Sequence, residues 1–353
     1  MRKKIKQYPL AAIITALVLS LTCSVTGFTQ TNLWQRVDIN NKASLRGSAV
    51  YQNSLWVTGS DNTVYVSQDG GKTWQNRSVV ANISTDFRDI ALFDNNTAIV
   101  MGAGEGQQSV LYKTSDAGLT WQLLLLNQAA KGFFDAIAFW DRNTGLLLGD
   151  PVDGYYVIKQ TQDGGKTWRR IAQDKLPKTL LKEAAFAASG NTLITGKNGQ
   201  AWLTTGGFSA SVYYSGDWGE SWRRQSVPLF QQTQTAGGYA LALNTQQQVF
   251  VLGGDYLQRS ASYANIATLL GQQWQQVDAG QRGLRTAMAC SKNTCIASGK
   301  TGSDISYNAG QQWQAFDDTA AAKNHQGFYT LAGGNGFILA AGAQGKVAIY
   351  QFD

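Results

Sequence analysis

The chain has 353 residues, of which 43% are hydrophobic and 15% charged, so it is long enough to bury a large core. Glycine (38) and tryptophan (11) are plentiful while proline (4) is scarce, which suits short strands joined by tight turns. The formal charge of +7 is misleading, because four of the 30 basic residues lie among the first six positions. The remainder carries 26 basic against 23 acidic residues, or +3. A domain with so small a net charge is not expected to bind nucleic acid or an anionic membrane through electrostatic attraction.

The first 27 residues predict a secretory signal peptide. Arg2–Lys6 form a charged segment, and the apolar Leu10–Leu21 segment that follows is too short for a comfortable membrane span. Cleavage near Gly27 leaves residues 28–353 as one mature domain with no membrane span, which we expect to be periplasmic or secreted. Cys23 is an alternative lipidation site, which would make the chain a lipoprotein.

An eight-residue motif then recurs along the chain. It reads Ser-Gln-Asp-Gly-Gly-Lys-Thr-Trp at 67–74 and returns at 114–121, 161–168 and 215–222, with worn copies ending at Trp274 and Trp313. The motif resembles the Asp-box of BNR repeats, S-x-D-x-G-x-T-W. Its Asp can accept hydrogen bonds from backbone N–H groups in a hairpin turn, its Gly supplies positive φ, and its Trp packs on the sheet. We therefore interpret Asp69, Asp116, Asp163 and Asp217 as structural rather than catalytic.

A second register gives the number of repeats. Each unit reads as an alternating strand, a turn, a second strand and then a glycine, at Gly59, Gly102, Gly149, Gly196, Gly253, Gly299 and Gly342. Seven units, each a four-stranded sheet, predict an all-β fold, a seven-bladed β-propeller. The last unit lacks an outer strand, and residues 33–39 can supply it. The ring would then close by pairing the N-terminal strand with the last blade, which removes an exposed edge.

Aligned by alternation, the innermost strands place one polar side chain each at the mouth of the central channel. These residues are Arg46, Arg88, Asp135, Glu183, Tyr239, Arg285 and Tyr329. Arginine forks suit a carboxylate or phosphate, and crowded carboxylates can shift in pKa and do acid–base work. The alternative is a water-filled channel in which arginines and carboxylates neutralise one another.

Loops after the glycines add polar residues to the same face. They are Glu105, Asp150, Asp153, Asp255, Tyr256 and Asp304. Together with the seven channel residues they form the predicted ligand-binding set, although each acid could equally be a turn residue that accepts backbone N–H groups.

Two cysteines remain in the mature domain. Cys290 and Cys295 flank a predicted hairpin turn, so a cross-strand disulfide is plausible in an exported protein, and two buried apolar thiols are the alternative. With a single histidine, His325, and no thiol cluster at ligand spacing, we predict no metal. No dinucleotide fingerprint is present, so we also predict no cofactor. We expect a monomer.

Nearly the whole mature chain resembles exported bacterial BNR/YVTN-type, WD40-like repeat proteins, the group likened to photosystem II stability and assembly factors. The matching segments are 87–89, 134–139, 149–154, 183 with 186–190, 253–256 and 302–304. Sialidases are more distantly similar, through Asp-boxes and three innermost-strand arginines. Where a sialidase has Arg-Ile-Pro, this chain has Leu45-Arg46-Gly47, so no catalytic assignment carries over.

Two functional hypotheses follow. The first is a non-catalytic binding or assembly propeller that holds an anionic ligand or a protein partner at the Arg46/Arg88/Arg285 face; a role in photosynthetic assembly would be a special case that needs a photosynthetic host. The alternative is an exo-acting, sialidase-like glycoside hydrolase with Asp135 or Glu183 as the acid/base. Such enzymes need two carboxyl groups at a defined separation, which a structure can test.

Overall fold

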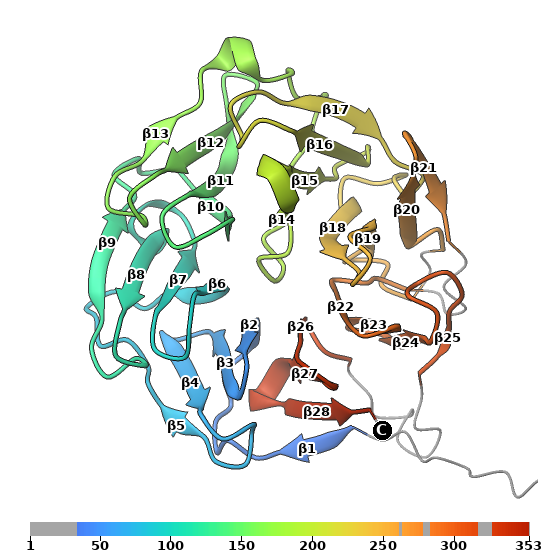
Figure 1. The fold of residues 1–353 in the computed structure, drawn as a ribbon. Helices are drawn as coiled ribbons and strands as arrows, with labels where there is room; N and C mark the ends of the chain where they lie inside the picture. Colours follow the sequence, from blue (N-terminus) through green and yellow to red (C-terminus); the bar gives the residue numbers. More distant parts are fainter. Residues whose placement is uncertain (1–33, 261–262, 278–282, 317–326, 353) are drawn as a thin grey trace, which may run out of the picture. The chain divides into compact units, whose positions relative to one another are not determined.

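A computed structural model describes residues 34–352 apart from 261–262, 278–282 and 317–326. The chain divides into two compact units, residues 1–32 and 33–353, and all described residues belong to the second. That unit contains seven four-stranded antiparallel sheets arranged as blades around a central channel (Figure 1). The predicted seven-bladed β-propeller is confirmed. The predicted signal peptide, Cys23 and His325 lie outside the described residues.

The blades are numbered in chain order, and each runs from its innermost to its outermost strand. Blade 1 contains β2 (Leu45–Tyr51), β3 (Ser54–Gly59), β4 (Thr63–Ser67) and β5 (Gln75–Asn76). Blade 2 contains β6 (Asp86–Leu92), β7 (Ala98–Ala103), β8 (Val110–Thr114) and β9 (Gln122–Leu126). Blade 3 contains β10 (Phe134–Phe139), β11 (Gly145–Val152), β12 (Tyr155–Thr161) and β13 (Arg169–Arg170). Blade 4 contains β14 (Leu193–Thr195), β15 (Ala201–Thr205), β16 (Ser211–Ser215) and β17 (Arg223–Ser226).

The remaining blades follow the same order. Blade 5 contains β18 (Ala236–Leu243), β19 (Val249–Asp255), β20 (Ile266–Leu270) and β21 (Gln273–Gln276). Blade 6 contains β22 (Ala287–Ser291), β23 (Thr294–Gly299), β24 (Gly302–Ser306) and β25 (Gln314–Ala315). Blade 7 contains β26 (Thr330–Gly333), β27 (Phe337–Ala341), β28 (Val347–Gln351) and β1 (Gln35–Val37). Short 3-10 turns occur at η1 (Gly106–Gln108), η2 (Gln173–Lys175), η3 (Lys197–Gly199) and η5 (Ala343–Gly345).

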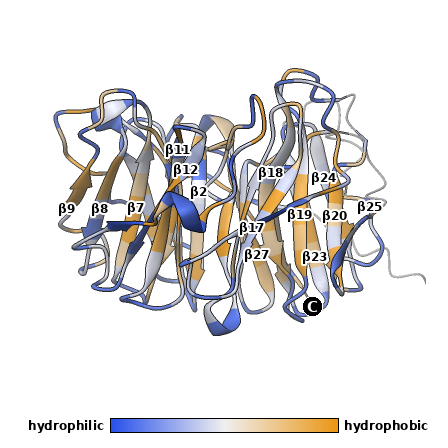
Figure 2. Cartoon of the chain, turned by 90° about the horizontal axis from the view of Figure 1, so that it is seen from above, coloured by the Kyte–Doolittle hydropathy of each residue, from blue (hydrophilic) through white to orange (hydrophobic). Residues whose placement is uncertain are grey.

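The core lies between the blades. Middle strands such as β3 and β7 are buried along their whole length, because each sheet packs face to face against both neighbours. Between blades 1 and 2, for example, Trp56 and Val64 pack with Phe87 and Val100. Hydrophobic strands therefore fill the middle of the fold, and hydrophilic turns lie at its two ends (Figure 2). Within the described part of the chain, no helix is long and apolar enough to cross a membrane.

The ring closes as the sequence predicted. Strand β1 pairs antiparallel with β28, with Gln35 opposite Ile349 and Val37 opposite Val347. The N-terminal strand is therefore the outer strand of blade 7. This pairing converts two loose ends into a ladder, which is a standard way of removing exposed sheet edges.

The Asp-box turns have the predicted structural chemistry. In the first box, the Asp69 carboxylate accepts the backbone N–H of Thr73 at 2.9 Å and the Thr73 hydroxyl at 2.6 Å. These bonds hold the pKa of the exposed Asp69 carboxyl well below its usual range. Equivalent bonds occur at Asp116, Asp163 and Asp217, and Asn308 in the worn box still accepts the N–H of Gln312 at 2.9 Å.

Blade 4 departs from the prediction. Gly196 was expected to end a second strand, but it follows the innermost strand β14, and the equivalent glycine is Gly206. Ala184 forms a bridge with Gly206, as Leu45 pairs with Gly59 in blade 1. The innermost strand thus starts at Ala184, leaves the sheet and resumes at β14.

The intervening residues 185–191, here called the plug, cross the central channel. The Ser189 hydroxyl donates to the carbonyl of Thr286 in blade 6 at 2.7 Å, and the carbonyl of Asn191 accepts the N–H of Leu241 in blade 5 at 2.7 Å. Phe186 stacks on Tyr239 with ring centroids 4.4 Å apart. Residues 186–190 occupy the place of an innermost strand in the repeat but lie outside the sheet, and the carbonyls of Ala188 and Ala187 accept hydrogen bonds from Arg46 and Arg88 of blades 1 and 2.

Candidate functional site

Four of the predicted channel residues lie at β-bulges. Arg46, Arg88, Asp135 and Tyr239 each lie at a register shift between the innermost and second strands of their blade. A β-bulge of this kind inserts an extra residue that has no partner in the ladder and re-aims its side chain. The bulges therefore turn these four side chains toward the channel, and the plug occupies the same position in blade 4.

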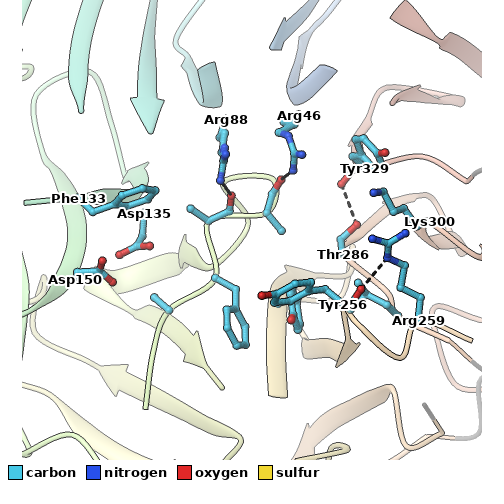
Figure 3. A pocket seen from close by; sticks show the side chains of 16 residues that line it. Arg46, Arg88, Phe133, Asp135, Asp150, Tyr256, Arg259, Thr286, Lys300 and Tyr329 are labelled. Carbon is cyan, nitrogen blue, oxygen red and sulfur yellow. Dashed lines mark hydrogen bonds between the residues drawn. The ribbon is translucent and has the colours of Figure 1, made fainter. Parts of the chain in front are cut away.

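These side chains line a cavity of about 420 Å³ at the mouth of the channel, here called the cup. The plug contributes residues 185–188 to its lining. From the predicted set the cup is lined by Arg46, Arg88, Asp135, Asp150, Tyr239, Tyr256 and Tyr329, and in addition by Phe133, Arg259, Leu284, Thr286 and Lys300 (Figure 3). The structure thus brings together seven predicted residues from five blades.

Arg46 and Arg88 are largely committed to other protein groups. Their Nε atoms lie 3.4 and 2.9 Å from the same carboxylate oxygen of Asp86. Arg46 also donates to the carbonyl of Ala188 at 3.2 Å, and Arg88 donates to that of Ala187 at 2.8 Å. Both arginines therefore hold the plug in place, and one carboxylate offsets part of their charge. Burial lowers the pKa of Arg46, with Asp86 opposing the effect.

Two carboxyl groups line another side of the cup. Asp135 is 1% exposed, and among the described residues its Oδ2 has no hydrogen-bond partner. Burial, reinforced by the charge of Asp150, raises the pKa of Asp135 well above its usual range, while Arg88 opposes the shift. Burial also raises the pKa of the half-buried Asp150. Figure 3 shows both side chains on the side of the cavity away from Lys300 and Arg259.

Two cations in the cup were not predicted. Arg259 is exposed and donates Nε to the carbonyl of Tyr256 at 2.7 Å, and Lys300 lies 5.5 Å from the centroid of the Tyr329 ring. No described carboxylate forms an ion pair with either. Burial lowers the pKa of Lys300, and the charges of Arg259 and Arg46 add to the effect. Lys300 directly follows Gly299, so it could have been predicted from the glycine register. No pattern in the sequence indicated Arg259.

Glu183 does not line the cup, contrary to its predicted place on an innermost strand. It precedes Ala184, where the strand begins, and is 7% exposed. Its carboxylate accepts the hydroxyls of Thr205 at 2.5 Å and Tyr213 at 2.9 Å and the N–H of Leu180 at 2.6 Å. The alignment erred because the plug interrupts the strand on which the alternation was counted.

Arg285 is also absent from the cup lining. It is fully buried, and its guanidinium pairs with Asp304, Nη2 to Oδ2 at 2.7 Å and Nε to Oδ2 at 2.7 Å. Both residues were predicted to face a ligand. Their mutual contact matches the alternative in which a channel arginine and a carboxylate neutralise each other.

Of the other loop acids, Asp255 stabilises its own loop, whereas Glu105 and Asp153 lie outside the cup. Asp255 is buried and accepts the hydroxyls of Thr233 and Thr235 and the N–H of Leu257, which anchors the loop that carries Tyr256 and Arg259. Glu105 precedes η1 and makes no side-chain capping bond. Asp153 is exposed in the β11–β12 turn with φ of 57°. Neither of these last two lines the cup.

A predicted disulfide is also present. Cys290 and Cys295 lie directly opposite each other on β22 and β23 and form an S–S bond. The alternative of two free thiols is therefore not adopted.

The fold and cup define a class: the chain is a seven-bladed Asp-box (BNR) repeat propeller with a polar cup at one end of a plugged channel. The family model described as Photosynthesis system II assembly factor YCF48 matches residues 29–105, so the chain resembles that family over its first blade and a half. The Photosystem II assembly protein Ycf48 of Synechococcus sp. (strain JA-3-3Ab) is 39% identical over 57 residues, which are 16% of this chain and only 17% of that protein.

Solved structures resemble the fold over most of its length. One described as YCF48 bound to D1 peptide has a TM-score of 0.68 at 16% identity and covers 92% of this chain and 96% of its own. YCF48 from Cyanidioschyzon merolae has a TM-score of 0.63 at 16% identity, with 90% and 98% covered. The GH74 enzyme of Niastella koreensis has a TM-score of 0.62 at 13% identity, with 89% and 53% covered. At these identities the likeness concerns the fold alone.

Proposed function

We propose that this protein is an exported, non-catalytic binding or assembly propeller that holds a segment of a partner protein in the cup. Arg259 and Lys300 carry the proposal, because they are the cup's cations with no described carboxylate as ion-pair partner. They would pair with acidic groups of the ligand, and the exposed ring of Tyr256 in the same cavity offers flat contact area.

The plug supports a binding role. It places backbone and small side chains across the channel, so the cup is lined at its base by residues 185–188. A ligand would enter and leave by one face and meet a surface that Arg46 and Arg88 hold in place through the Ala188 and Ala187 carbonyls. Such preorganisation lowers the ordering cost of binding.

Two further observations fit. A structurally similar propeller has been solved with a D1 peptide bound, which shows that a fold of this kind can hold a peptide. The Cys290–Cys295 disulfide is the kind of bond that persists in oxidising compartments, which supports export. A photosystem assembly role is the specific form of the proposal that the Ycf48 resemblance favours.

A random 12-residue peptide library displayed on phage tests the proposal. Selection on the purified protein should enrich peptides that contain Asp or Glu, and the best should bind in fluorescence anisotropy. Lys300→Gln and Arg259→Gln should each weaken that binding about tenfold or more, as expected for a charge-assisted hydrogen bond. Lys292→Gln is the matched control, because this exposed lysine lies at the other end of β23. The proposal fails if nothing is enriched, or if both cup variants bind like the control.

The alternative, a glycoside hydrolase, has one observation in its favour. Asp135 and Asp150 line the same cavity, and burial raises the pKa of both, as an acid catalyst requires. The other candidate, Glu183, has no place in the cup. Turnover of 4-methylumbelliferyl glycosides that Asp135→Asn abolishes would establish this alternative. No turnover across neutral and acidic sugars would remove it.

A further inference from the structure

We propose that Asp135 and Asp150 form a subsite for a positively charged group, the side chain of a lysine or arginine in the bound segment. The cup would then recognise a bipolar peptide, with a basic residue at one side and an acidic residue at Lys300 and Arg259. The inference rests on the proposed function, because it describes the second half of the same site.

Asp135 is the first part of the argument. Its bulge position on β10 turns the side chain out of the ladder and into the cup, where it is 1% exposed (Figure 3). Placing a carboxyl group in such surroundings is costly unless it is hydrogen-bonded or paired. Yet among the described residues its Oδ2 has no hydrogen-bond partner. A ligand group that donates hydrogen bonds and carries positive charge would satisfy it.

Other buried acids of the fold show the contrast. Asp89 accepts the N–H of Ile90 at 2.8 Å and that of Ile137 at 2.7 Å, one with each oxygen. Asp255 and Glu183 are likewise held by hydroxyl and N–H donors. These three acids are thus held by nearby donors, and Asp86 and Asp304 each form an ion pair with an arginine. Asp135, which faces the cavity, forms no ion pair among the described residues and differs from them in this respect.

Neighbouring cations do not fill the subsite. Arg88, whose charge acts on Asp135, directs its Nε to Asp86 at 2.9 Å and its Nη1 to the Ala187 carbonyl at 2.8 Å. No ion pair joins Arg88 to Asp135 or Asp150 among the described residues. The second carboxyl, Asp150, lies close enough for its charge to disfavour ionisation of Asp135, and a cationic ligand group would relieve this repulsion.

The cup's other features suit a basic side chain. A lysine ammonium has three donors and a guanidinium has five, enough to engage both carboxyl groups at once. Phe133 and Ala185 line the same cavity and offer apolar contact for the aliphatic stem. On the opposite side of the cavity, Lys300 and Arg259 provide positive charge for an acidic residue of the same peptide (Figure 3). Opposed charges of this kind also fix the direction in which a peptide lies.

The phage selection is repeated on three proteins: wild type, the double variant Asp135→Asn/Asp150→Asn, and Asp153→Asn. The last is the matched control, an exposed acid in the β11–β12 turn outside the cup. Wild type and control should enrich peptides with Lys or Arg together with Asp or Glu. The double variant should lose the basic residue and keep the acidic one. Thermal melts should show that it folds, since Asn keeps the shape and removes a buried charge.

Measurement on one selected peptide completes the test. Replacing its basic residue by norleucine should weaken binding to wild type about 10- to 100-fold in fluorescence anisotropy, and to the double variant less than about twofold. This first comparison needs only the wild-type protein, so it holds even if the double variant does not fold. Peptides with acidic but no basic residues would overturn the subsite and leave the proposed function standing. No enriched peptide at all would overturn both.

Discussion

Replacing Gly190 by alanine should dislodge the plug. Gly190 has φ of 73°, and a Cβ there would lie 2.3 Å from Cγ of Asp89. The Asp89 carboxyl cannot swing aside freely, because the N–H groups of Ile90 and Ile137 hold it at 2.8 and 2.7 Å. The substitution must therefore move the plug, or break these two bonds, or both.

The magnitude follows from the two contributions. Left-handed backbone costs an alanine about 1–2 kcal/mol relative to glycine. Losing two buried hydrogen bonds adds roughly 1 kcal/mol each, or more where the donors stay unsatisfied. We expect Gly190→Ala to lower the free energy of unfolding by about 3–5 kcal/mol. Gly70→Ala is the control, since Gly70 has φ of 75° and no atom within 4 Å of the added Cβ. It should cost about 1–2 kcal/mol.

Urea unfolding followed by tryptophan fluorescence measures both variants. A double-mutant cycle isolates the steric part. Gly190→Ala made in an Asp89→Gly background, which removes all three side-chain atoms that crowd the added Cβ, should cost no more than Gly70→Ala does. Peptide binding at the cup should fall with Gly190→Ala and persist with Gly70→Ala. Equal costs for the two glycines, within about 0.5 kcal/mol, would refute the reasoning, since the Asp89 contact would then carry no energy.

Three further predictions concern buried groups. Burial raises the pKa of Asp89 to about 8, whereas an aspartate in the unfolded chain has a pKa of about 4. Between these values the folded state binds one proton more than the unfolded state. The free energy of unfolding should therefore fall from pH 5 to 8, by at most about 1.4 kcal/mol per pH unit. Urea midpoints of Asp89→Asn should fall less steeply with pH than those of wild type, because Asp135 and Asp150 still contribute, and an unchanged slope would contradict the assignment. Arg285→Met should cost about 3–5 kcal/mol, because it takes the cation from buried Asp304; unfolding curves that overlay wild type would exclude a structural pair. Reducing the Cys290–Cys295 bond should cost about 2 kcal/mol for so short a loop, measured as the unfolding midpoint with and without dithiothreitol; a Cys290→Ser/Cys295→Ser protein that still responds to reductant would show another cause.

Much of the architecture was predictable because its signals are local. The Asp-box turns depend on hydrogen bonds across four residues, such as Asp69 to Thr73, so each copy reports its own hairpin. The Asp-boxes and the glycines together gave the number of blades, which is seven. The last unit is one strand short, and this shortage predicted that the N-terminal strand completes it. Equivalent positions on the innermost strands also identified four bulge residues of the cup, because a repeat places the same backbone feature at the same step.

The plug could not be predicted in this way. Its residues fall where the repeat places an innermost strand. They are held outside the sheet by bonds to Arg46 and Arg88, which lie 142 and 99 residues away in the chain. That insertion shifted the count in blade 4 and misplaced Glu183 and Gly196. Arg285 fits the pattern of a channel residue, yet its pairing with Asp304 on a different strand turned it inward.

The sequence by itself thus determined the repeat, the number of blades, the closing strand and the positions from which side chains enter the channel, because turn chemistry and strand alternation act over a few residues. Only the tertiary structure decided which charges are already satisfied. Arg46 and Arg88 pair with Asp86 and donate hydrogen bonds to the plug, and Arg285 pairs with Asp304. Asp135, in contrast, faces the cup, and its Oδ2 has no hydrogen-bond partner among the described residues. Electrostatic pairing falls off with distance in space and not along the chain, so the binding character of the cup depends on contacts that no local pattern encodes.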